Sequence, residues 1–130
     1  RDLTPLLAEM ARAPLSLLLH PNRDCAYDEA ETCIRLGRAN PQALAAQAAS
    51  YRAEQFPAHQ GLYETSVLFR RHTPEVANLM ESWWHHIQTH TARDQLSLPF
   101  VFWQAQIQPQ AFAFRHWHDP FFLQYPHTWH

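Results

Sequence analysis

Short apolar runs alternate with amphipathic stretches along this chain, and the alternation limits the possible folds more than any other feature. Strands are predicted at residues 15–19, 64–71 and 112–114. Apolar residues at three- and four-residue spacing predict helices at residues 4–13, 24–37, 40–51, 73–87 and 93–103. Strands that alternate with helices indicate an α/β layer architecture. We therefore expect a single domain, 1–130, that is rich in helix and has a small sheet.

The composition excludes several classes of function. The chain has 130 residues, of which only two are glycine, so it lacks the glycine-rich loops that hold nucleotide phosphates in P-loop and Rossmann proteins. Its net charge of −2 gives no basic stripe for nucleic acid. No apolar run approaches the ~20 residues of a membrane-spanning helix. We expect no nucleic-acid partner and no membrane span in this segment.

The two cysteines, Cys25 and Cys33, lie in a segment predicted to be helical. Eight residues of helix rise about 12 Å, whereas the Cα atoms of a disulfide lie within about 7 Å of each other. We therefore predict two free thiols and a reducing compartment, which fits a bacterial cytoplasm.

A polar turn, His20-Pro21-Asn22-Arg23-Asp24, follows the first predicted strand. Ligands of open α/β sheets bind beyond the carboxyl ends of strands. His20, Arg23 and Asp24 are therefore candidates for a pocket edge. The alternative is a solvated turn in which Asp24 only caps the next helix.

A second polar group, Arg93-Asp94-Gln95, opens an apolar helix, which Pro99 is expected to distort or delay. A carboxylate and an amide at a helix start can hold sugar hydroxyls, and an arginine can face a phosphate. The alternative is that Asp94 only caps the helix. Glu64, which leads into the second strand, is a candidate base or ligand for an acceptor hydroxyl.

Histidine is abundant, with ten in the chain. His86 and His90 have the four-residue helical spacing that can bind zinc. No cysteine or acidic ligand stands near them at a suitable spacing, so we expect them, with His85, on the polar face of the Trp83 helix. His116 and His118 alternate across a possible strand, where one of them could serve a shared metal site.

Four segments together resemble one family. They are His20-Pro21-Asn22-Arg23-Asp24-Cys25-Ala26-Tyr27-Asp28-Glu29-Ala30; Tyr51 with Phe56-Pro57 and Gly61-Leu62-Tyr63-Glu64; Val67-Leu68-Phe69-Arg70-Arg71-His72; and Trp83-Trp84 followed by Arg93-Asp94-Gln95-Leu96-Ser97-Leu98-Pro99-Phe100-Val101. Their order and spacing are similar to the glycosyltransferase-like family of bacteria and plants long catalogued as a domain of unknown function. Its plant members include turgor-regulation-defect and mucilage-related proteins.

The resemblance implies a GT-A-like fold and transfer of a sugar from a nucleoside-diphosphate sugar to a carbohydrate or glycan acceptor. In such folds a divalent metal, Mn or Mg, held by an Asp-x-Asp motif, neutralises the diphosphate leaving group. This sequence has no Asp-x-Asp. The resemblance thus implies that the chain is the C-terminal, acceptor-side portion of the domain and is inactive alone. His116 or His118 would complete a metal site only together with carboxylates of an upstream nucleotide-binding half.

The resemblance also implies roles for the polar segments. Asp94 and Gln95 are expected to face the transferred sugar, with Arg93 beside the phosphates. His20, Arg23 and Asp24 are expected to line the same cleft. Glu64, proposed above as a base, is the third candidate catalytic residue beside Asp94 and Gln95. Two other readings stay open: a noncatalytic carbohydrate-binding or scaffold domain, and a small histidine-rich metal-binding protein.

Overall fold

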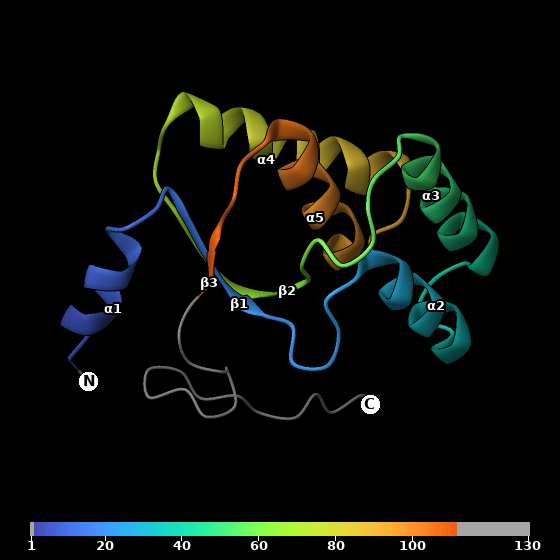
Figure 1. Ribbon diagram of the computed structural model, residues 1–130, viewed down its shortest axis with the longest axis horizontal. Coiled ribbons are helices and arrows are strands. Elements are labelled where there is room, and N and C mark those ends of the chain that lie inside the picture. The colour runs from blue at the N-terminus through green and yellow to red at the C-terminus, as the bar shows by residue number, and fades with distance from the viewer. Residues whose placement is uncertain (1, 112–130) are drawn as a thin grey trace.

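A computed structural model describes residues 2–111, in which helices α4 and α5 lie on one side of a small sheet (Figure 1). The elements in chain order are α1 (Thr4–Met10), β1 (Leu15–Leu19), α2 (Ala26–Leu36), α3 (Pro41–Ala53), β2 (Tyr63–Arg70), α4 (Pro74–Thr89), α5 (Asp94–Ala105) and β3 (Gln110–Ala111). The predicted helix-rich α/β class with a small sheet is confirmed.

The sheet is centred on β1, which pairs antiparallel with β2 and parallel with β3. The register between β1 and β2 is irregular: Leu17 pairs with Leu68, but Leu18 pairs with Glu64. The extra residues in β2 form a bulge that includes Thr65. Bulges re-aim side chains at sheet edges and next to functional sites, and this one brings Thr65 within reach of α5.

The third strand is observed at Gln110–Ala111. The predicted stretch, residues 112–114, lies outside the described residues, so its pairing stays a prediction. Among the described residues, no helix has both the length and the apolar character needed to cross a membrane.

Local sequence signals explain most helix ends. Asn40 accepts a hydrogen bond from Ala43 N at 3.0 Å, and Thr73 accepts one from Val76 N at 3.3 Å, so both residues cap helices whose first residue is proline. Helix α2 ends at Gly37, whose φ of 66° is a left-handed conformation that glycine adopts at low cost. Pro99 lies inside α5, but it does not delay that helix, which begins at Asp94.

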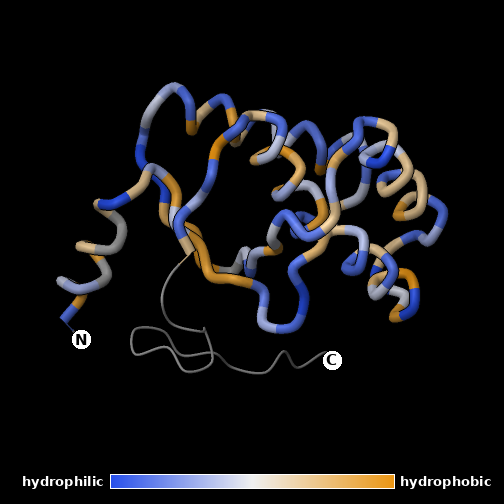
Figure 2. The backbone as a smooth tube through the Cα atoms, in the orientation of Figure 1, coloured by the Kyte–Doolittle hydropathy of each residue, from blue (hydrophilic) through white to orange (hydrophobic). Residues whose placement is uncertain are grey.

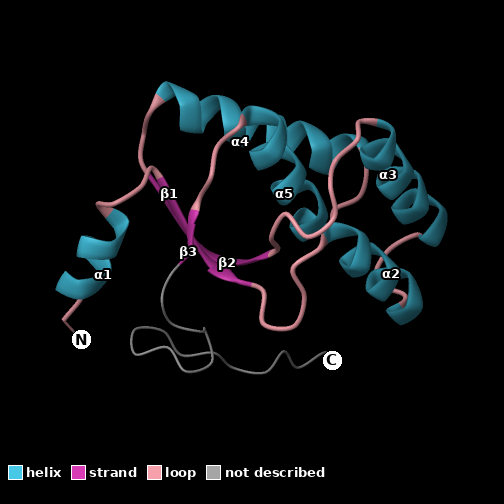
Figure 3. Ribbon diagram, viewed as in Figure 1, coloured by secondary structure: helices cyan, strands magenta, loops and turns pink. Residues whose placement is uncertain are grey.

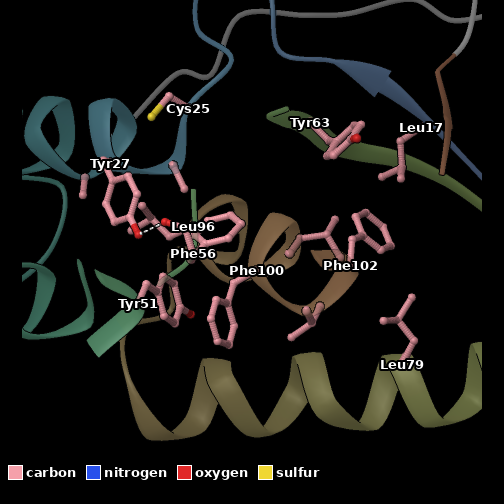
Figure 4. Close-up of a cluster of buried hydrophobic side chains, with 14 of the residues drawn as sticks. Leu17, Cys25, Tyr27, Tyr51, Phe56, Tyr63, Leu79, Leu96, Phe100 and Phe102 are labelled. Carbon is pink, nitrogen blue, oxygen red and sulfur yellow. Dashed lines mark hydrogen bonds between the residues drawn. The ribbon is translucent and has the colours of Figure 1, made fainter. Parts of the chain in front are cut away.

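Helix α5 lies at the centre of the core and is buried on almost every side, as its nearly uniform apolar sequence requires. The apolar segments of β1 and α5 stand out against the more polar outer helices (Figure 2). In the core, Phe102 of α5 meets Tyr63 of β2 edge-on, with ring centroids 5.6 Å apart, and Leu17 and Leu79 flank it (Figure 4).

An aromatic and polar cluster joins α3 to α4 and α5. Tyr51 stacks on Phe100, with ring centroids 4.1 Å apart and planes 4° from parallel. The Tyr51 hydroxyl accepts a hydrogen bond from Gln47 Nε2 at 3.0 Å, and Gln47 Oε1 accepts one from Thr91 Oγ1 at 2.6 Å. Burial raises the pKa of Tyr51 to about 12, so the phenol stays neutral and the buried network carries no charge.

Candidate functional site

The polar turn between β1 and α2 is organised by the ring of His20. Its Nδ1 accepts hydrogen bonds from the backbone N–H groups of Asn22 and Arg23, each at 3.2 Å. The neutral ring therefore carries its hydrogen on Nε2. The His20 backbone N–H donates to Leu62 O at 2.9 Å, which ties the turn to the segment before β2.

The turn closes over a buried carboxylate, that of Glu29 on α2. Arg23 Nε donates to Glu29 Oε2 at 2.6 Å, and His20 Nε2 lies 3.9 Å from the same oxygen. The Glu29 side chain is 1% exposed, whereas that of Arg23 is 24% exposed. Burial lowers the pKa of His20, and the Glu29 carboxylate opposes part of that shift. A carboxylate buried this deeply needs its charged partner.

Cys33 extends this cluster toward the start of α5. Its Sγ lies 3.5 Å from Glu29 Oε1, one helical turn away along α2. Burial raises the pKa of the Cys33 thiol, and Glu29 raises it further, whereas the positive charge of the nearby Arg93 guanidinium acts against the shift. Cys33 thus contacts Glu29 on one side and Arg93 on the other, and it remains a thiol at neutral pH.

At the start of α5, the side chain of Asp94 is fixed by β2 and its backbone by α4. Thr65 Oγ1, from the bulge, donates to Asp94 Oδ2 at 3.1 Å. Trp83 Nε1 donates to the Asp94 carbonyl at 3.2 Å. The residue before it, Arg93, is the N-cap but makes no side-chain cap bond. Its Nε is buried and has no hydrogen-bond partner within the described part of the chain.

The structure therefore connects the two predicted segments. His20 and Arg23 from the turn, and Arg93 from the start of α5, meet through Glu29 and Cys33. Neither of two cavities found within residues 2–111 is lined by a residue of these segments. The shared hollow expected between the segments stays a prediction.

Three predicted site residues have other surroundings. Asp24 does not cap α2: the N-cap is Cys25, and the exposed Asp24 carboxylate lies 2.7 Å from His59 Nδ1 instead. Glu64 pairs with Leu18 in the sheet, and its charge acts to raise the pKa of His20. Gln95 is half-buried in the first turn of α5, and Asp94 beside it is that helix's first residue rather than its cap.

The histidine predictions have different outcomes. His116 and His118 lie outside the described residues. The rings of His86 and His90 are 5.4 Å apart, but they do not form a simple polar face. His86 Nδ1 lies 3.0 Å from the Tyr51 hydroxyl, and burial lowers the pKa of both histidines. Both rings therefore belong to the aromatic cluster around Tyr51. The predicted pair of free thiols is confirmed.

A cavity of about 560 Å³ lies beside the second half of α5. Trp103 and Phe102 from α5 and Tyr63 from β2 supply its aromatic surface. Its polar lining consists of one carboxylate and four amides, those of Glu54, Gln60, Gln104, Gln106 and Gln108. Aromatic faces beside planar amides are suited to a sugar, which presents both C–H faces and hydroxyl groups.

Sequence reasoning missed the residues that join the two segments. Glu29 and Cys33 stand four apart in a predicted helix, a spacing that puts both on one face, and that spacing was the available signal. Thr65 had none, because its contact with Asp94 depends on a bulge that alternation of apolar residues does not reveal.

A family model described as "TOD1/MUCI70, glycosyltransferase-like domain" matches residues 6–123. Comparisons with curated proteins and with solved structures give no match. The matched range includes both polar segments and Glu29, the carboxylate that the turn encloses. The chain belongs to the TOD1/MUCI70 glycosyltransferase-like domain family.

Proposed function

We propose that this chain works in a glycosyltransferase of GT-A-like architecture, which moves a sugar from a nucleoside-diphosphate sugar to a carbohydrate acceptor. One observation carries the proposal: the turn at residues 20–24 and the start of α5 meet at a single charged cluster. Among the groups joined through Glu29 and Cys33, two are guanidinium groups, those of Arg23 and Arg93, and one is a carboxylate. Guanidinium groups suit the oxygens of a diphosphate.

Arg93 is the residue best placed for the leaving group. A guanidinium presents planar N–H donors that match phosphate oxygens in pairs, and Arg93 Nε has no protein acceptor within residues 2–111. A buried N–H without an acceptor costs free energy, and an oxygen of the diphosphate would remove that cost. Charge that develops on the leaving group during transfer is stabilised in the same way.

Asp94 and Gln95 are assigned to the transferred sugar. Thr65 and Trp83 hold Asp94 in one orientation, and a fixed carboxylate beside an amide can accept from and donate to adjacent hydroxyls. Holding the sugar in a fixed orientation relative to the leaving group can supply a large part of the rate enhancement of a transferase. Glu64, in β2, is assigned to the acceptor hydroxyl as base.

The described residues around Arg93 and Asp94 do not fit a Mn or Mg site. Such ions take several oxygen ligands. The three side chains of the described residues that gather closely enough to hold a metal ion are Cys25, Asp28 and His59, which do not lie at this cluster. We therefore assign no step to a metal at this cluster. The divalent ion expected with an upstream half, and a contribution from His116 or His118, remain proposals.

The test is nucleotide release by the full-length polypeptide that carries this chain, with a panel of nucleoside-diphosphate sugars and oligosaccharide acceptors. Asp94→Asn should lower kcat by about 10²-fold while the fold is retained, because the sugar loses its orienting group. Arg93→Lys should raise the donor KM, because the paired donors are lost. Glu75→Gln, at the matching first turn of α4, serves as the control. Unchanged turnover in Asp94→Asn would remove Asp94 from the site.

The cavity beside α5 favours a second candidate, a noncatalytic carbohydrate-binding domain. Its aromatic and amide lining offers a surface for an oligosaccharide without any donor. Trp103→Ala should then abolish oligosaccharide-induced shifts in the NMR spectrum of the chain. Binding of an oligosaccharide, without nucleotide release from any donor, would favour this candidate over the transferase.

A further inference from the structure

The loop between α3 and β2 passes the start of α2 (Figure 3) and contacts Asp24, the last residue of the polar turn. Gly61 N donates to Asp24 O at 3.0 Å, and His59 Nδ1 lies 2.7 Å from Asp24 Oδ1. These two contacts bring a histidine beside the cysteine and the aspartate of the first turn of α2.

Three side chains of different chemistry gather there. The Sγ of Cys25, a carboxylate oxygen of Asp28 and a ring nitrogen of His59 all lie within 4.8 Å of one another. Ligand atoms around a tetrahedral zinc ion, at bond lengths of about 2.0–2.3 Å, are about 3.3–3.7 Å apart. A displacement of about 1 Å therefore separates this arrangement from a coordination shell. We propose that Cys25, Asp28 and His59 bind a zinc ion.

The donor set favours zinc over the harder ions that nucleotide-sugar chemistry uses. A thiolate, an imidazole and one carboxylate suit zinc, whereas magnesium and manganese prefer oxygen ligands throughout. Cys25 is the N-cap of α2, and its side chain makes no capping hydrogen bond that metal binding would break.

Asp24 completes the arrangement from outside the ligand shell. When its carboxylate accepts the Nδ1 hydrogen of His59, the ring keeps its lone pair on Nε2, which can bind a metal. A carboxylate behind a ligating histidine is the usual way in which a protein orients the ring. This gives Asp24 a function at the turn, although it caps no helix.

Three protein ligands leave a fourth position for water, as in open zinc sites. His59 and Asp28 are exposed and Cys25 is buried, so an ion would enter from solvent. The bound ion would fix the loop around His59 to the start of α2, and thereby hold the turn that carries Arg23.

The test is metal binding by the chain after chelator treatment, with Zn²⁺ titrated calorimetrically and Co²⁺ titrated by absorbance. We expect one equivalent of Zn²⁺ to bind and a sulfur-to-cobalt charge-transfer band to appear. His59→Ala and Asp28→Asn should weaken Zn²⁺ binding by more than about 100-fold, and Asp24→Asn by about 10–100-fold. Cys25→Ser should remove the charge-transfer band. The exposed variants, His59→Ala and Asp28→Asn, keep the test valid if Cys25→Ser does not fold.

Matched controls separate this site from other sites in the chain. Cys33→Ser should keep the charge-transfer band, and His72→Ala, at an exposed histidine, should keep wild-type affinity. His86→Ala tests the helical histidine pair and should also leave binding unchanged. The proposal is overturned if the wild-type chain binds no Zn²⁺, if His59→Ala binds as tightly as wild type, or if binding is lost in His86→Ala instead.

Discussion

Removing Arg23 should destabilise the protein more than removing its partner Glu29, because the two side chains are buried to different extents. The two side chains make one short contact, 2.6 Å between Arg23 Nε and Glu29 Oε2, but they differ in exposure: 1% for Glu29 and 24% for Arg23. Removing the arginine leaves an isolated carboxylate in the interior. Removing the carboxylate leaves an arginine that can turn toward solvent.

The magnitudes follow from that difference. Arg23→Met should lower the free energy of unfolding by about 3–5 kcal/mol, the usual cost of a buried charge left without its partner. Glu29→Gln should cost about 1.5–3 kcal/mol, because an amide retains the shape and one acceptor but loses the charge. The double variant should cost less than the sum of the two, because no unpaired buried charge remains.

The measurement is urea denaturation at neutral pH, followed by tryptophan fluorescence, for wild type, both single variants and the double variant. Arg38→Met, at an exposed arginine, is the control and should stay within about 0.5 kcal/mol of wild type. The reasoning would be refuted if Arg23→Met and Glu29→Gln lowered the free energy of unfolding equally. It would also be refuted if the double variant lost the full sum of the two.

Two further predictions concern the core and the histidines. Leu17→Ala, at a fully buried position of β1, should cost about 2–5 kcal/mol in chemical denaturation. Leu19→Ala, at the exposed end of the same strand, should change stability by less than about 0.5 kcal/mol. Similar costs for the two variants would contradict the burial of Leu17. Burial lowers the pKa of His20, His86 and His90 below the ordinary value of 6.5. The unfolded chain therefore binds these protons more readily, and their contribution to stability is complete above that value and is lost as the pH falls below it. The urea midpoint should drop between about pH 7.5 and about pH 5.5, and a midpoint that stays constant would contradict the burial of these rings.

The elements themselves could be predicted because their signals are local. Proline after Asn40 and after Thr73 marks two helix starts, and Gly37 marks a helix end, all as observed. The bounded apolar run at residues 15–19 is the strand β1. Such features depend on neighbouring residues alone, so the sequence displays them directly.

The connections within the site could be predicted only in part. That the turn and the start of α5 belong together followed from the family resemblance, and no spacing indicated it. The partner of each side chain depended on tertiary packing: Asp24 turned to His59, and Asp94 met Thr65 across a strand irregularity. These two contacts join residues that are 35 and 29 positions apart in the sequence, so no local pattern indicates them.

Helix α5 connects two candidate binding regions: Arg93 and Asp94 stand at its N-terminal end, and its second half lines the cavity. Twelve residues of helix form a rod about 18 Å long. A diphosphate bound by the arginines and a sugar bound beside Trp103 would therefore contact opposite ends of the same helix.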